Sequence, residues 1–167
     1  MFLVRLIYAS TACGNLNATD FQNILTASIR NNRQGNITGM LSCDGRYFLQ
    51  CLEGSRKAVN ETYTRILNDP RHSDVVLLSY GEIPSRHFGE WAMGYVALTS
   101  NAEIQRDVLL RLVLNPDDAP SDKPRVQSLP IPRTKFLKYS TKSEFEPYSL
   151  SEDGSLALLR DLATLFA

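Results

Sequence analysis

The fold is decided by residues 46–54, Arg46-Tyr47-Phe48-Leu49-Gln50-Cys51-Leu52-Glu53-Gly54. Side chains alternate between the two faces of a β-strand, so Phe48, Gln50 and Leu52 share one face. Gln50 therefore lies between two large apolar residues on a face that should be buried. A buried amide without hydrogen-bond partners costs about 1–3 kcal/mol, so the fold must supply a partner for Gln50.

The first predicted strand, residues 2–10, offers that partner. The face that holds Val4 and Leu6 also holds Tyr8. Apolar residues on both faces predict a strand that is central in a sheet or covered on both sides. An inward Tyr8 and an inward Gln50 form either a satisfied polar pair in the core or the floor of a ligand site.

A β-hairpin precedes Gln50. Asp44-Gly45 separates predicted strands at residues 37–43 and 46–53, and this dipeptide is the strongest short signal for a hairpin turn. The hairpin places the strand of Gln50 beside the strand before it.

Two amphipathic helices flank the hairpin. Asn17 is the predicted N-cap of the first helix, which should end at Asn31-Asn32. Ser55 is the predicted N-cap of the second helix, and Asp69-Pro70 closes it. The stripes at helical spacing are Phe21, Ile24, Leu25, Ser28 and Ile29 in the first helix, and Val59, Thr62, Tyr63, Ile66 and Leu67 in the second.

The order of elements predicts an α+β fold. Further strands are expected at residues 75–80 and 91–98, which gives a ferredoxin-like βαββαββ sandwich with a five-stranded sheet and two helices on one face. The first strand then lies beside the third. Tyr8 and Gln50 should therefore floor a groove between the two helices.

The chain changes character after residue 98. We expect one domain at residues 1–98 and a C-terminal helical extension at residues 99–167, with a proline-rich linker at about 115–132. Helices are predicted to start at Asn101 and Ser151. The closing helix presents an apolar stripe that must be buried on the open face of the sheet, on another helix or on another subunit: Leu156, Leu159, Leu162, Ala163 and Phe166.

Composition disfavours several classes of function. Eighteen basic and 18 acidic residues give zero net charge, which offers no electrostatic footprint for nucleic acid or a membrane surface. Three cysteines without Cys-x-x-Cys spacing disfavour a disulfide framework or zinc site and fit a reducing compartment. No signal peptide and no membrane-spanning run are evident, so we expect a soluble cytoplasmic protein.

Other polar residues are candidates for a binding site. Asn31 and Asn32 could cap a helix, or recognise a planar heterocycle with an imide edge, because Asn offers a donor and an acceptor. Arg65 and Asp69 could form an exposed ion pair, or lie at the rim of the groove and meet an anionic or polyol tail. Arg71 and His72 could contribute to the same rim.

Signatures of enzymes are scarce. The two histidines lack metal-ligand spacing, and neither a phosphate-binding glycine loop nor a nucleophile elbow is present. Trp91 and Met93 would share a face of the last strand, as core residues or as a movable part of a site. The alternatives to a binding protein are a small ferredoxin-like enzyme, flavin-reducing or acylphosphatase-like, and a ligand-free dimerisation module.

Six separated motifs, in order and at compatible spacing, resemble the BLUF family of blue-light sensors that use flavin. They are Tyr8 in Leu-Ile-Tyr-Ala-Ser, Asn31-Asn32 followed by Ile37-Thr38-Gly39-Met40-Leu41, Phe48-Leu49-Gln50-Cys51-Leu52-Glu53-Gly54, Tyr63-x-Arg65-Ile66, Asp69-x-Arg71-His72, and Trp91-Ala-Met93. The resemblance covers about residues 1–98. The rest is similar to short, PixD-like members without an enzymatic domain, and departs from them in its long proline-rich linker.

The resemblance implies a flavin, usually FAD with FMN as the alternative, bound noncovalently between the two helices. Asn32 would contact its carbonyl and imide edge, and Asn31 and Arg65 its other polar edge. The remaining contacts would come from Gln50, Asp69 and Ser28, from Ile24 and Ile66 on either side of the ring, and from Arg71 and His72 at the rim.

The resemblance also implies a switch rather than a catalyst. Under blue light Tyr8 would donate an electron, and its proton would follow through Gln50, which is left rotated or tautomerised. The absorption would shift slightly to the red, and Met93 and Trp91 would pass the change to the tail. The implied partners are copies of this chain, as a dimer or a larger ring, and a response-regulator-like protein in the control of phototaxis.

Overall fold

A computed structural model describes residues 2–14, 16–89, 92–97, 126–128 and 145–164. Its strands are β1 (Leu3–Ala12), β2 (Thr38–Cys43), β3 (Tyr47–Ser55), β4 (His72–Ile83), β5 (Gly94–Ala97) and β6 (Val126–Ser128). Its helices are α1 (Ala18–Gln34), α2 (Arg56–Leu67), the short 3-10 helix η3 (Pro147–Ser149) and α4 (Glu152–Ala163). Among the described helices, none has the length and apolarity needed to cross a membrane.

The sheet has the strand order β4-β1-β3-β2-β5-β6. Its first four strands are antiparallel, which confirms the ferredoxin-like arrangement with β1 beside β3. β5 adds the predicted fifth strand, parallel to β2, and β6 adds a sixth, parallel to β5. The sixth strand corrects the prediction that residues 115–132 form only a linker, because the residues between Pro124 and Pro130 keep the backbone N–H groups that a strand needs.

Local signals placed the elements correctly. Asn17 caps α1 in a reciprocal capping box with Asp20, and Ser55 caps α2 by accepting from the backbone N–H of Ala58. The Asp44-Gly45 turn joins β2 to β3, with Gly45 at φ +95°, a conformation that favours glycine. Gly39 in β2 also allows a close approach of strands, since a Cβ there would lie 2.1 Å from the carbonyl oxygen of Cys51.

Several boundaries differ from the prediction. α1 does not end at Asn31-Asn32 but continues to Gln34, with Gly35 as C-cap. β4 has twelve residues rather than the predicted six, at positions 75–80. It lies at the edge of the sheet and is half-exposed, so both of its ends carry polar residues that do not show a strand pattern. β5 begins only at Gly94, so Met93 precedes the strand, and Trp91 lies outside the described residues.

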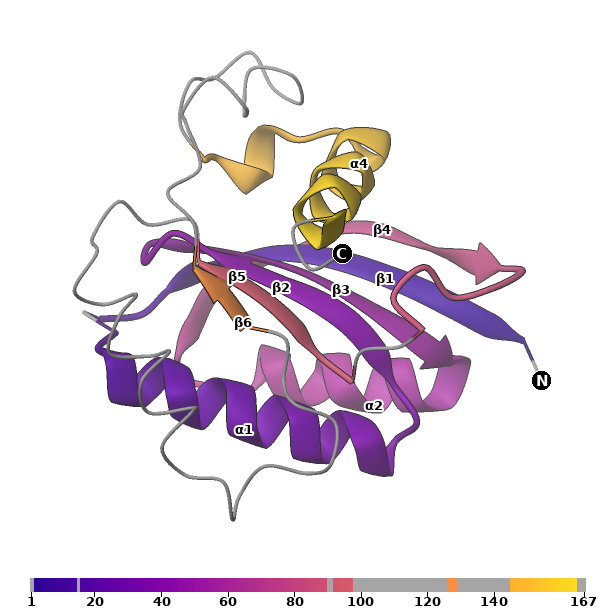
Figure 1. The fold of residues 1–167 in the computed structure, drawn as a ribbon, viewed down its shortest axis with the longest axis horizontal. Helices are drawn as coiled ribbons and strands as arrows, with labels where there is room; N and C mark the ends of the chain where they lie inside the picture. The colour runs from indigo at the N-terminus through magenta and orange to yellow at the C-terminus, as the bar shows by residue number, and fades with distance from the viewer. Residues whose placement is uncertain (1, 15, 90–91, 98–125, 129–144, 165–167) are drawn as a thin grey trace.

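The sheet has a core on each face (Figure 1). α1 and α2 cover one face, where Phe48 and Leu52 are buried with Tyr8, as predicted. α4 covers the other face. The exposed Leu67, at 49%, departs from the predicted stripe of α2.

The closing helix α4 starts at its predicted N-cap, Ser151. Its buried stripe consists of Ser155, Leu158, Leu159 and Leu162. Leu159 and Leu162 belong to the predicted stripe, whereas Ser155 and Leu158 do not. Leu156 and Ala163 are partly buried against the same core. Phe166 and the helix predicted from Asn101 lie outside the described residues.

Leu159→Ala should lower the free energy of unfolding by about 2–5 kcal/mol, because Leu159 is fully buried between α4 and the sheet. Urea denaturation of the full chain measures the loss. Leu156→Ala, in the same helix but only partly buried, is the matched control and should cost less. Equal losses for the two variants would contradict the packing of α4 against the sheet.

Candidate functional site

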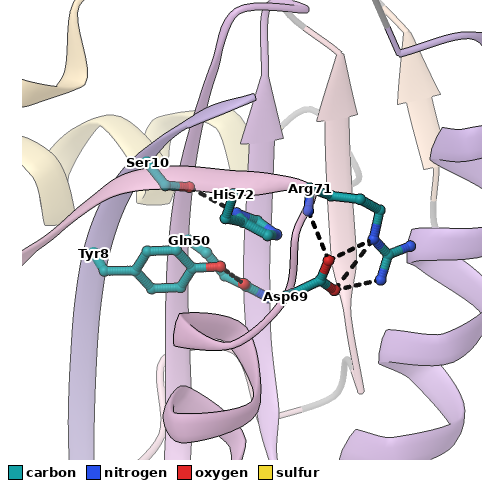
Figure 2. Close-up of polar contacts among 6 residues, drawn as sticks. All are labelled: Tyr8, Ser10, Gln50, Asp69, Arg71 and His72. Atoms are coloured by element: carbon teal, nitrogen blue, oxygen red, sulfur yellow. Dashed lines mark hydrogen bonds and ion pairs between the residues drawn. The ribbon is translucent and has the colours of Figure 1, made fainter. Parts of the chain in front are cut away.

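The site is built on two residues that face each other across adjacent strands. The β1–β3 register pairs Tyr8 with Gln50, and the Tyr8 hydroxyl donates to Oε1 of Gln50 (Figure 2). Both side chains are buried. Nε2 of Gln50 donates to Sδ of Met93 at 3.5 Å. Both ends of the amide are therefore held, which satisfies the polar group that the sequence placed in a core.

A pocket opens beside this pair, against α1 and α2. It contains about 610 Å³ of space free of atoms, a figure that includes the open solvent at its mouth. Every residue predicted to bind a cofactor lines it, together with Tyr8: Ile24, Ser28, Asn31, Asn32, Gln50, Arg65, Ile66, Asp69, Arg71 and His72. The predicted groove floored by Tyr8 and Gln50 is therefore present.

Three further lining residues, Ala27, Leu41 and Thr62, were not singled out from the sequence. Leu41 could have been found, because the hairpin register pairs it with Gln50. Ala27 follows Ile24 by three positions, on the same side of α1. Thr62 was assigned to the apolar stripe of α2, and its position four residues before Ile66 indicated a shared face.

Asn31 and Asn32 lie in the last turn of α1 rather than at its cap, since the helix continues to Gln34. Their alternative role as C-caps is therefore wrong. Asn32 is buried and donates from Nδ2 to the carbonyl oxygen of Ala92 at 2.9 Å. This bond joins the wall of the pocket to the residue before Met93.

Charged residues form the rim. Arg71 donates from Nε to both carboxylate oxygens of Asp69, at 2.9 and 3.2 Å, and these hydrogen bonds lower the pKa of Asp69. Arg65 donates instead to Oγ1 of Thr62 at 2.7 Å. The alternative of an Arg65–Asp69 ion pair is thus replaced by a pair between Asp69 and Arg71 (Figure 2).

His72 lies between the rim and the Tyr8–Gln50 pair. Its Nδ1 is 2.8 Å from Oγ of Ser10, and its ring centroid is 4.6 Å from that of Phe48. Burial lowers the pKa of His72, so the ring is neutral at neutral pH. A neutral imidazole adds no charge beside the floor of the pocket.

Tyr8 is a protonated donor. Burial raises the pKa of its phenol far above the ordinary value, and the nearby Tyr63 and Asp69 raise this pKa further. The phenol therefore keeps its proton at neutral pH and offers it to Gln50. A phenolic proton that is hydrogen-bonded to an amide acceptor next to an open pocket can take part in coupled transfer of a proton and an electron.

The donor set fits a flat heterocycle with an imide edge. Ile24, Leu41 and Ile66 provide apolar contact, and the amides of Asn31 and Asn32 provide both donors and acceptors. The described residues contain no cluster of three or more His, Cys, Asp or Glu side chains that could hold a metal ion. The apolar residues and the amides of the lining together suit an organic aromatic ligand.

Comparison with known proteins identifies such a ligand. The family model "BLUF: Sensors of blue-light using FAD" matches residues 3–94. The blue light- and temperature-regulated antirepressor BluF of Escherichia coli is 32% identical over 113 residues, which cover 68% of this chain and 27% of BluF. Photoactivated adenylate cyclase subunit beta of Euglena gracilis is 36% identical over 92 residues, which cover 54% of this chain and 11% of the cyclase. The chain thus matches about a quarter or less of these curated relatives.

Solved structures agree over more of the chain. The photo-activated state of BlsA superposes with a TM-score of 0.66 at 26% identity, covering 96% of this chain and 94% of BlsA. The dark state of BlrB gives a TM-score of 0.57 at 32% identity, covering 70% of this chain and 89% of BlrB. With its phenol–amide pair beside a pocket for an aromatic ring, the chain belongs to the BLUF family of blue-light sensors that use FAD.

Proposed function

We propose that this protein senses light through the Tyr8–Gln50 pair, acting on a flavin in the pocket beside α1 and α2, and that it works as a switch rather than as a catalyst. The observation that carries the proposal is the chain of contacts from Tyr8 through Gln50 to Met93 at the floor of that pocket. Gln50 in β3 contacts Tyr8 in β1 and Met93 just before β5, so a change in its amide alters contacts with both of these segments.

The residues at the pocket have separate roles toward the flavin, with FAD as the first candidate and FMN as the second. Asn32 still has one amide hydrogen and Oδ1 for the carbonyl and imide edge, after its bond to Ala92. Asn31 and Arg65 serve the other polar edge, with Ser28 and Asp69 in support. Ile24 and Ile66 hold the ring system, and Arg71 and His72 lie toward the tail of the ligand.

The flavin supplies the absorption of blue light and, once excited, a strong electron acceptor. Tyr8 gives up an electron, and its phenolic proton crosses the existing hydrogen bond to Oε1 of Gln50. When the electron and a proton return to Tyr8, Gln50 is left rotated or tautomerised. The carboxamide suits this role because its two ends differ in hydrogen-bonding sense while the shape of the group barely changes.

The rearranged Gln50 no longer presents the same group to Met93. Met93 directly precedes β5, which lies between β2 and β6. A displaced Met93 therefore shifts β5 and, through it, the β6 strand of the C-terminal extension. Trp91 is assigned to the same output path by resemblance. We further propose a cytoplasmic homo-oligomer, a dimer or a larger ring, that signals to a response-regulator-like protein in phototaxis-type behaviour.

Tyr8→Phe should keep the flavin but abolish the reversible red shift under blue light, because the ring stays while its proton is lost. Light-minus-dark absorption spectra of the purified protein measure the shift. Tyr63→Phe is the matched control: its ring lies 5.6 Å from that of Tyr8, and it should retain the full shift. A complete photocycle in Tyr8→Phe would refute the role of Tyr8.

Ala27→Leu should weaken flavin binding at least tenfold, about 1.4 kcal/mol, because the larger side chain occupies the wall of the pocket. Titration of the flavin-free protein with FAD measures the dissociation constant. Thr26→Leu adds a leucine at the adjacent, exposed position of α1 and should bind normally. Equal affinity in both variants would place the flavin elsewhere.

A further inference from the structure

Glu53 is a buried carboxylate on the face of the sheet opposite the pocket. It follows Gln50 by three residues in β3, so the two side chains point to opposite faces. Its Oε1 lies 2.8 Å from both Nε and Nη2 of Arg5. Its Oε2 accepts from the backbone N–H of Phe88 at 2.9 Å. The carboxylate thus joins β1 and β3 to the segment 84–89, which follows β4.

Arg86 fixes the same segment from a second direction. Its Nη1 donates to the backbone oxygen of Glu53 at 2.7 Å and to Oγ1 of Thr38 at 2.9 Å. Its Nη2 donates to the backbone oxygen of Asn36 at 2.7 Å. Between these anchors Phe88 is buried in the core beneath α4. We refer to Arg5, Glu53, Arg86 and Phe88 as the segment clamp.

The clamp contains a buried ion pair between Arg5 and Glu53. A buried ion pair loses much of its attraction to desolvation, and well-packed apolar residues often replace such a pair at no loss of stability. A buried carboxylate with directional partners instead fixes geometry. Here it fixes a backbone N–H five residues before Met93, relative to the strand that carries Gln50.

Two contacts fix the chain on the N-terminal side of Met93. The clamp holds the backbone of Phe88, and Asn32 binds the carbonyl oxygen of Ala92. Sδ of Met93 lies 3.5 Å from Nε2 of Gln50, and Met93 is buried. Met93 is therefore the immediate neighbour of the Gln50 amide at Nε2.

We propose that Glu53 is a positioning residue of the photoreceptor: together with Arg86 it fixes Met93 against the Gln50 amide and slows the thermal return from the light-adapted state. This inference rests on the proposed function, since it concerns the rearrangement of Gln50. A rigidly placed Met93 raises the barrier that the amide must cross. A loosened segment lowers it.

The test is Glu53→Gln in the full chain with bound flavin. The variant keeps the shape of the side chain but puts an amide N–H₂ where Arg5 or Phe88 needs an acceptor. We expect the red shift to persist, dark recovery to be at least threefold faster, and the Phe88 amide to exchange hydrogen at least tenfold faster in the dark. Glu82→Gln removes the same charge from the exposed Arg56–Glu82 ion pair and should change neither quantity.

A second background separates positioning from a general loss of stability. In Met93→Ala, Glu53→Gln should still accelerate exchange at Phe88 but should no longer change the recovery rate. Arg86→Gln, at a partly exposed position, should repeat both effects of Glu53→Gln and serves if that variant does not fold.

Two results would overturn the proposal: recovery that is unchanged or slower in both clamp variants, or equal acceleration with and without Met93. A wild-type protein that shows no reversible red shift would instead refute the proposed function. The two failures are therefore distinguishable in one set of measurements.

Discussion

The register of β1 against β3 is the constraint on which the rest of this structure depends. It places the Tyr8 phenol opposite the Gln50 amide, on the face covered by α1 and α2. A slip of one residue would turn either side chain to the other face of the sheet, because strand side chains alternate. The hairpin turn at Asp44-Gly45 and the apolar neighbours Phe48 and Leu52 make that slip costly, so one hydrogen bond is specified by a large hydrophobic core.

β3 serves both faces of the sheet at once. Gln50 points into the pocket, while Leu49, Cys51 and Glu53 point toward α4 or the segment after β4. The strand is therefore shared by the Tyr8–Gln50 pair and by contacts with α4 and with the segment after β4. Interiors this densely packed transmit small displacements instead of absorbing them, which lets a reoriented amide have effects beyond its own pocket.

Much of this arrangement could be predicted from local sequence, and the failures have physical reasons. Cap residues such as Asn17 and Ser55 bind backbone groups only two or three residues away, so the starts of the helices could be predicted from local sequence. The hairpin turn is likewise local, and with the helices it predicts the groove. The end of α1 was misplaced because Arg33 and Gln34 are good helix formers. The partner of Asp69 depends on rotamers, and the partners of Glu53 come from segments far apart in sequence. Neither set of partners can be predicted from a local sequence pattern.

The two ends of the Gln50 amide are held unequally, and this inequality is what makes a switch possible. Oε1 accepts from a phenol, a strong donor, whereas Nε2 donates to a thioether sulfur, a weak acceptor. Reorientation must break the first contact but gives up little at the second. In the proposed switch, light breaks the first contact by removing the phenolic proton for a moment. In the same proposal, the rate of return in darkness depends on what surrounds the sulfur, so the placement of Met93 matters more than the strength of its bond.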